Sequence, residues 1–119
     1  MDTRKCGRIY EEIAEKYLKK LGYRIAERNF SCKIGEIDLI AYDGRVLVFV
    51  EVKYRKNPSS GYPEEAVSYT KQRKISRTAD FYCIKNNISE RTDRRFDVVA
   101  IDGDVIRHHK NAFMYCGGY

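Results

Sequence analysis

A valine-rich segment at residues 46–53 carries two charges in a run that is otherwise apolar. Side chains alternate along a β-strand, so Glu51 and Lys53 project from the same face as Leu47 and Phe49. A desolvated charge is costly unless it is paired or bound to a metal ion. The two charges therefore indicate either a functional site on this strand or a strand end that meets water as a solvated ion pair.

The preceding segment, residues 35–42, alternates polar and apolar residues and leads directly into Asp43-Gly44. This pattern predicts a β-hairpin. With residues 43–44 as the two turn residues, Asp38 lies opposite Phe49. Asp38 is then a diagonal neighbour of Glu51, roughly 7–8 Å away, a distance that two carboxylates can close around a shared cation.

In the same register Glu36 lies opposite Glu51, so three carboxylates share one face of the hairpin. Like charges in such positions repel and call for a compensating cation. Lys53 supplies one positive charge, and a divalent ion would supply two. Oxygen ligands without a nearby His or Cys suit Mg²⁺ or Mn²⁺ better than zinc. The arrangement fits phosphodiester hydrolysis, in which a metal held by Asp38 and Glu51 activates water while Lys53 orients the nucleophile or stabilises charge.

Two helices are predicted. The first covers residues 7–21, and Glu11 lies at the edge of its apolar stripe, where it either reaches over the sheet or is an ordinary boundary residue. The second begins at Pro63 and runs to about Lys85. Lys71 lies near the middle of its stripe, so its ammonium must snorkel or contact an anion. The stripes consist of Tyr10, Ile13, Ala14, Tyr17, Leu18 and Leu21 in the first helix and Val67, Ile75, Thr78, Ala79 and Tyr82 in the second.

Further strands are predicted at residues 23–29, 96–101 and 105–108. Asp97 in the second of these is expected to satisfy nearby backbone groups or to pair with an arginine. The order α-β-β-β-α-β-β predicts an α/β fold with two helices packed on a mixed sheet. A chain of 119 residues has room for one domain, residues 1–119.

The net charge of +6 and the isoelectric point near 9.2 favour a polyanionic partner, although any single basic group can also be a solvated surface. Residues 56–62 are predicted to form a mobile loop near the site. The chain has no run of eighteen apolar residues and no secretory segment, so a cytoplasmic protein without membrane contact is expected. The four cysteines are then expected to be free thiols.

These motifs resemble the PD-(D/E)XK nuclease superfamily, which includes restriction endonucleases and archaeal Holliday-junction resolvases. The literal proline of that name is replaced here by Ile37, which precedes Asp38. Over nearly the whole chain the sequence more closely resembles the YraN-like uncharacterised bacterial family. The segments that carry this resemblance are Glu11 to Leu18, Arg28-Asn29, residues 35–40, residues 49–53, Ala66-Val67 with Lys71, residues 95–98 and residues 111–113.

The resemblance implies a restriction-endonuclease-like αβββαβ core and a Mg²⁺- or Mn²⁺-dependent DNA endonuclease, with branched or recombination DNA as candidate substrates. Asp38 and Glu51 would be metal ligands with the Val52 carbonyl as a third, and Lys53 the catalytic lysine. By the same analogy Glu11 supplies an outer acidic group, and the protein is a homodimer that cuts two strands symmetrically. Glu36, which the hairpin register places on the same face, is a candidate accessory acid. The candidate DNA-binding residues are Arg28, Arg55, Lys71 and Lys74.

Two other classes of function fit the same residues, because a fold does not by itself fix activity. One is a nucleic-acid-binding or assembly protein whose acidic centre does no chemistry. The other is a protein-interaction domain in which Glu36, Glu51 and Lys53 form a structural charge network.

Overall fold

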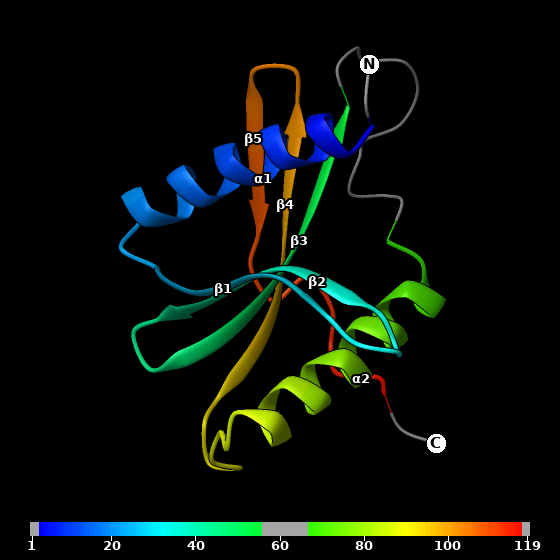
Figure 1. Cartoon of the computed structure of the whole chain (residues 1–119). Helices are drawn as coiled ribbons and strands as arrows, with labels where there is room; N and C mark the ends of the chain where they lie inside the picture. The colour runs from blue at the N-terminus through cyan, green and yellow to red at the C-terminus, as the bar shows by residue number, and fades with distance from the viewer. Residues whose placement is uncertain (1–2, 56–66, 118–119) are drawn as a thin grey trace.

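The structure, a computed structural model, describes residues 3–55 and 67–117 of the chain. The elements follow the predicted order α-β-β-β-α-β-β (Figure 1). They are α1 (Thr3–Lys20), β1 (Arg24–Ser31), β2 (Glu36–Asp43), β3 (Val46–Arg55), α2 (Tyr69–Lys85), β4 (Arg94–Asp102) and β5 (Val105–His109).

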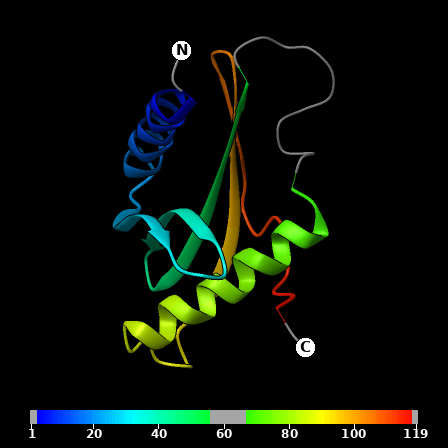
Figure 2. The same cartoon turned by 45° about the vertical axis from the view of Figure 1, so that its right-hand side comes forward.

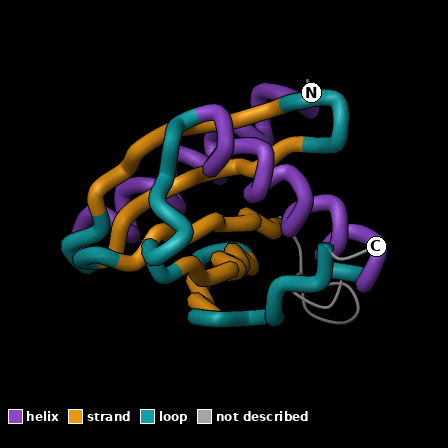
Figure 3. The backbone as a smooth tube through the Cα atoms, turned by 90° about the horizontal axis from the view of Figure 1, so that it is seen from below, coloured by secondary structure: helices purple, strands orange, loops and turns teal. Residues whose placement is uncertain are grey.

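The five strands form one mixed sheet in the order β1-β2-β3-β4-β5. The first three strands are antiparallel, β3 and β4 are parallel, and β5 returns antiparallel to β4. Parallel neighbours need a crossover connection, which here contains α2. Loops join the strands at their ends (Figure 3). The predicted α/β fold with a mixed sheet and two helices is confirmed, and it is consistent with a restriction-endonuclease-like core.

The helices cover opposite faces of the sheet, as Figure 2 shows. Helix α1 buries Ala14 and Leu18 against one face, while α2 buries Ile75 and Ala79 against the other. The buried strand residues divide accordingly. Those packed with α1 are Leu39, Ala41, Val48, Val50, Val52, Val99 and Ile101, and those packed with α2 are Phe30, Ile37, Ile40, Leu47, Phe49 and Phe96.

Helix α1 begins at Thr3, four residues before the predicted start. Cys6 is buried and lies one helical turn before Tyr10, so the inward face continues beyond the stripe that the apolar residues alone suggested. The predicted apolar stripe also includes two residues that are not buried. Ile13 is 36% exposed and Leu21 is 50% exposed, whereas Ala14 and Leu18 are fully buried.

Helix α2 begins at Tyr69, and the predicted start at Pro63 is wrong insofar as Val67 and Ser68 are not helical. Ser68 caps the helix because its hydroxyl accepts a hydrogen bond from the backbone N–H of Lys71. Pro63 itself and the predicted loop at residues 56–62 lie outside the described residues. The other inward positions of this helix are confirmed as buried: Ile75, Thr78, Ala79 and Tyr82.

The register of the β2–β3 hairpin differs from the prediction by two residues. Asp43 pairs with Val46, so the turn consists of Gly44 and Arg45 rather than Asp43 and Gly44. Gly44 has a φ of 61°, which suits glycine at the first position of a two-residue turn. The predicted pairing of Asp38 with Phe49 is therefore wrong, because Ile40 lies opposite Phe49.

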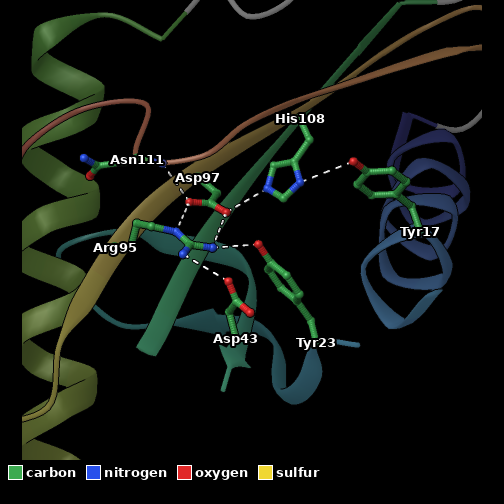
Figure 4. Close-up of polar contacts among 7 residues, drawn as sticks. All are labelled: Tyr17, Tyr23, Asp43, Arg95, Asp97, His108 and Asn111. Atoms are coloured by element: carbon green, nitrogen blue, oxygen red, sulfur yellow. Dashed lines mark hydrogen bonds and ion pairs between the residues drawn. The ribbon is translucent and has the colours of Figure 1, made fainter. Parts of the chain in front are cut away.

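A buried polar cluster joins the strands to α1 (Figure 4). Asp97 is fully buried and accepts hydrogen bonds from the Arg95 side chain at 2.8 Å and from the backbone N–H of Asn111 at 3.0 Å. His108 Nε2 lies 2.7 Å from the same carboxylate, and its Nδ1 lies 3.4 Å from the Tyr17 hydroxyl on α1. The predicted pairing of Asp97 with an arginine and a backbone group is confirmed, and the contact with His108 was missed.

Burial by itself would raise the pKa of Asp97, but the hydrogen bonds from His108, Arg95 and Asn111 outweigh it, so the pKa lies below the ordinary value. Arg95 also reaches the Tyr23 hydroxyl at 2.6 Å, and burial raises the pKa of that tyrosine to about 12. The cluster thus connects β4 and β5 to the start of β1 and to α1.

All four cysteines are free thiols, as predicted. Neither helix in the described part of the chain has the length and apolar character that crossing a bilayer requires.

Candidate functional site

The candidate site lies where β2 and β3 separate. Their ladder ends at the pair Leu39 and Val50, and β3 continues while β1 and β2 turn away (Figure 1). Beyond that pair the backbone N–H of Val52 donates a hydrogen bond to Asp38 Oδ2 at 2.7 Å. The Asp38 carboxylate thus supplies the acceptor for a backbone N–H of β3 that lies beyond the last paired residues of the β2–β3 ladder.

This hydrogen bond also orients the Val52 carbonyl, the predicted third ligand. In an extended strand the N–H and C=O of one residue point to the same side, which is why antiparallel partners exchange both hydrogen bonds. Because the Val52 N–H points to Asp38, its carbonyl is directed to the same edge of β3. Two oxygen donors from neighbouring strands thus face the same opening.

Glu51 lies level with Asp38 in the observed register, directly across the separating strands instead of diagonally as predicted. Its carboxylate is only 6% exposed and is approached by two ammonium groups. Lys53 Nζ lies 3.5 Å from Glu51 Oε1, and Lys71 Nζ lies 3.3 Å from the same oxygen. Of the two outcomes expected for Lys71, contact with an anion is the one observed.

The electrostatic state of Asp38 reflects this crowding. Its pKa is raised from 3.8 to about 7, first by burial and then by the nearby charge of Glu51, whereas the hydrogen bond from Val52 opposes the shift. Glu11 also raises it, and Lys71 lowers it. Burial is therefore the main cause of the shift, and repulsion from the neighbouring carboxylates adds to it.

Helix α1 contributes Glu11 to the same region. Burial raises the pKa of Glu11, a side-chain hydrogen bond with Asn29 lowers it, and the charges of Glu36 and Glu51 raise it. Glu11 therefore reaches over the sheet, which is the first of the two alternatives predicted for it. The prediction also grouped Glu36 with the acids, and its charge acts on Glu11, although it does not pair with Glu51 as expected.

Asn29 was not predicted as a site residue. Its φ of 51° places it in the left-handed region, and its side chain bonds to Glu11. Asparagine tolerates this conformation better than most residues, because its short polar side chain can bond locally. The sequence held two signals for this residue: an asparagine near the end of a strand, and its place in the Arg28-Asn29 segment that carries the family resemblance.

The donor set fits a hard divalent ion, since all of its groups are oxygens. No three His, Cys, Asp or Glu side chains among the described residues are arranged to hold a metal ion. An ion at this position would take Asp38, Glu51 and the Val52 carbonyl. These are the ligands that the superfamily resemblance implies, and they stay a prediction.

The candidate DNA-binding residues fall into two groups. Arg28 lies in a cavity of about 420 Å³ beside Glu11 and is bound by Glu15, whose pKa it lowers to about 2. Arg55 forms two hydrogen bonds of 2.9 Å with Asp102. Both arginines thus have carboxylate partners within the chain. Lys71 approaches Glu51, and Lys74 is exposed on α2 one turn further along.

Comparison with known proteins gives one consistent result. The model of the family described as "Uncharacterised protein family UPF0102" matches residues 10–101. The chain belongs to this family. The UPF0102 protein of Lachnoclostridium phytofermentans is 47% identical over 113 residues, which cover 95% of this chain and 96% of that protein. The relative from Caldicellulosiruptor saccharolyticus is 44% identical and is covered over its full length.

A third UPF0102 relative, from Persephonella marina, is 46% identical over 107 residues, or 90% of this chain. All residues of the candidate site lie inside the segment that the UPF0102 model matches: Glu11, Asn29, Glu36, Asp38, Glu51, Val52, Lys53 and Lys71. The resemblance to the YraN-like family is thereby confirmed, while membership of the nuclease superfamily stays a prediction.

Proposed function

We propose that this UPF0102 protein is a Mg²⁺- or Mn²⁺-dependent DNA endonuclease that hydrolyses phosphodiester bonds in the cytoplasm. The observation that carries the proposal is the position of Asp38, bonded to Val52 and level with Glu51 where two strands separate. Buried carboxylates on adjacent strands are costly without a compensating charge, and hard cations bind such oxygens. Glu11, which lines a cavity, and the two lysines at Glu51, Lys53 and Lys71, complete the set of charged groups.

Asp38, Glu51 and the Val52 carbonyl would hold the ion, and bound there it supplies positive charge that polarises a phosphate and lowers the pKa of water. Lys53 and Lys71 lie at Glu51 and can donate hydrogen bonds to phosphate oxygens. We assign Lys53 the catalytic role, because it is held at 21% exposure beside Glu51, whereas Lys71 is 42% exposed. In hydrolysis the oxygen of water forms a bond to phosphorus, one phosphoester bond breaks, and a proton passes to the departing oxygen.

Branched or recombination DNA is the substrate that we propose within this class. A symmetrical junction requires two cuts on opposite strands, so a homodimer would present two such sites. Analytical ultracentrifugation of the free protein and of its complex with a four-way junction tests this part separately. A monomer in both states contradicts the dimer without bearing on hydrolysis.

Cleavage assays test the central proposal. End-labelled single strands, duplexes and four-way junctions are incubated with Mg²⁺, Mn²⁺ or EDTA. We expect cleavage of at least one substrate only with a divalent ion, and a loss of about 10²-fold or more in Lys53→Ala and Asp38→Asn. The control Asp104→Asn changes an exposed aspartate in the β4–β5 turn and should retain full activity.

No cleavage of any substrate by a correctly folded protein would overturn the proposal.

One observation favours the second candidate, a nucleic-acid-binding or assembly protein without catalysis. Lys53 and Lys71 both lie near Glu51, so this carboxylate already has cationic partners without a metal ion. DNA binding that depends on salt but not on Mg²⁺ supports that function.

The melting temperature of Glu51→Gln separates the metal site from a structural charge network. If Glu51 is a metal ligand, Glu51→Gln should have the same melting temperature as the wild type, or a higher one, without Mg²⁺. The rise in melting temperature that Mg²⁺ gives the wild type should be absent from the variant. If Glu51 serves the network, the substitution leaves Lys53 and Lys71 without their carboxylate and lowers stability in both conditions.

A further inference from the structure

Two neighbouring cavities lie between α2 and the β1–β2 connection, residues 32–35, and both are lined by Ile34. Their volumes are about 400 and 430 Å³. The connection lies alongside α2 in both Figure 1 and Figure 2. A Cβ built on Gly35 would lie 3.3 Å from Thr78 Oγ1 and 3.8 Å from Lys74 Cβ, so the connection packs closely against α2. We call these two cavities together the α2 groove.

Among the residues that the structure describes, every charged side chain that lines the α2 groove is positive. Five lysine or arginine side chains line it, and no aspartate or glutamate of the described chain does. The cations come from both walls, Lys33 from the connection and the others from α2. They are Lys33, Arg73, Lys74, Arg77 and Lys85. A concave surface lined by cations alone concentrates anions and favours a polyanionic ligand.

The groove starts beside the candidate site. Lys71 lies 3.3 Å from Glu51, and Lys74 is its neighbour on the helix surface, three residues along. From Thr70 to Lys85 the helix advances about 22 Å, at 1.5 Å per residue. At about 3.4 Å per stacked nucleotide this length accommodates roughly six nucleotides of one strand.

The apolar part of the lining distinguishes a single strand from a duplex. Phe81 is 43% exposed and lines the second cavity together with Ile34. A duplex conceals the faces of its bases, whereas unpaired bases stack on exposed aromatic side chains while the backbone follows the cations. Exposed apolar surface between lysines therefore suits an unpaired strand.

We propose that the α2 groove binds a single strand of DNA that leads away from the acidic centre. The role of this strand as the flank of a cleaved substrate rests on the proposed function, but the binding does not. The substrate class that follows is DNA with an unpaired segment of at least about six nucleotides next to the cleavage point.

Fluorescence anisotropy with a labelled 12-nucleotide strand in EDTA tests the groove without any cleavage. The double variant Lys33→Gln/Lys74→Gln removes one cation from each wall, and both side chains are exposed, so folding should be preserved. We expect a loss of affinity of about tenfold or more and a slope of log K against log salt that is flatter by about 1.4, or 0.7 for each phosphate contact. Phe81→Ala should weaken binding with no change in this slope.

The matched control, Lys16→Gln/Lys20→Gln, removes two exposed charges from α1 and should change affinity less than twofold. If both double variants lose the same affinity for the strand, the groove is only part of a general basic surface, and the inference is overturned. Equal competition by polyglutamate of the same charge would also overturn it in favour of an acidic protein. Groove-dependent binding without cleavage contradicts only the proposed function, and cleavage unaffected by the groove variant contradicts only this inference.

Discussion

The carboxylate of Asp38 accepts a hydrogen bond from the backbone N–H of Val52 at 2.7 Å, across the point where β2 and β3 separate. A single acceptor from a side chain thus continues a backbone ladder that would otherwise stop at Leu39 and Val50. The same contact holds Asp38 level with Glu51. The strand ending and the acidic centre are therefore one structural feature.

Asp38→Asn should stabilise the metal-free protein at pH 8. The folded-state pKa of about 7 lies above the ordinary 3.8, so ionised Asp38 opposes folding above pH 7, the penalty shrinks as the pH falls from 7 to 4, and it is absent below 3.8. The amide keeps an acceptor for Val52. We expect a gain on the order of 2–4 kcal/mol at pH 8 and none near pH 3.5, measured by urea denaturation.

Mg²⁺ should stabilise the wild type by mass action and have little effect on Asp38→Asn. The control Asp104→Asn, at an exposed turn position, should show neither the pH-dependent gain nor the loss of the Mg²⁺ effect. A variant less stable than the wild type at pH 8 would contradict the assigned repulsion.

Asp97→Asn should destabilise the protein by about 3–5 kcal/mol, because it removes the only carboxylate that the described residues place at the buried His108 side chain and leaves half-buried Arg95 with the carboxylate of Asp43 alone. Asp43→Asn removes another contact of Arg95, but the Asp43 side chain is 36% exposed, so about 1 kcal/mol or less is expected. Chemical denaturation of both variants measures the difference. Similar values for the two would show that burial does not decide the strength of this cluster.

The Asp97 cluster also predicts loss of stability in acid. The pKa of this carboxyl is depressed in the folded state, so its contribution is complete above the unfolded value near 3.8 and is lost as the pH falls through the folded pKa. The slope of stability against pH below 4 should therefore be smaller in Asp97→Asn than in the wild type. Parallel slopes would contradict the assigned shift.

Lys71→Met should cost about 1–2 kcal/mol without metal, because it removes one of the two ammonium groups at buried Glu51. In a Glu51→Gln background the cost should vanish, and the double-mutant cycle reports this coupling. Lys74→Met, one turn further along the exposed surface, should cost less than about 0.5 kcal/mol in either background. A coupling energy near zero would count against the Lys71 contact.

Gly44→Ala should cost about 1 kcal/mol, since the φ of 61° at the hairpin turn is unfavourable for alanine although no atom lies within 4 Å of the added Cβ. Gly44→Asn should cost less, because asparagine tolerates this region. Gly7→Ala is the matched comparison. Its Cβ would lie 3.8 Å from the Tyr54 hydroxyl, an ordinary contact, so a helical gain of about 0.5–1 kcal/mol is expected in thermal melts. Equal effects at both glycines would contradict the role of φ.

Local patterns predicted the element order because they depend on periodicity alone. The alternation in residues 46–53 and the glycine at 44 specify a hairpin whichever residues form its turn. They did not specify its register, since a shift of two residues keeps every side chain on the same face. The turn geometry at Gly44-Arg45 decided it, and with it the level position of Asp38 and Glu51.

The sequence by itself determined the order of helices and strands, the charges placed on a buried strand and the residue types suited to a hard cation. The tertiary structure decided which of these charges meet. Lys71 reaches Glu51 because α2, capped by Ser68, begins at Tyr69 and packs across the sheet. Asn29 bonds to Glu11 because β1 and α1 pack against each other. Such contacts join residues 18 to 20 positions apart, and their energies depend on distance and burial, which exist only once the helices are docked on the sheet.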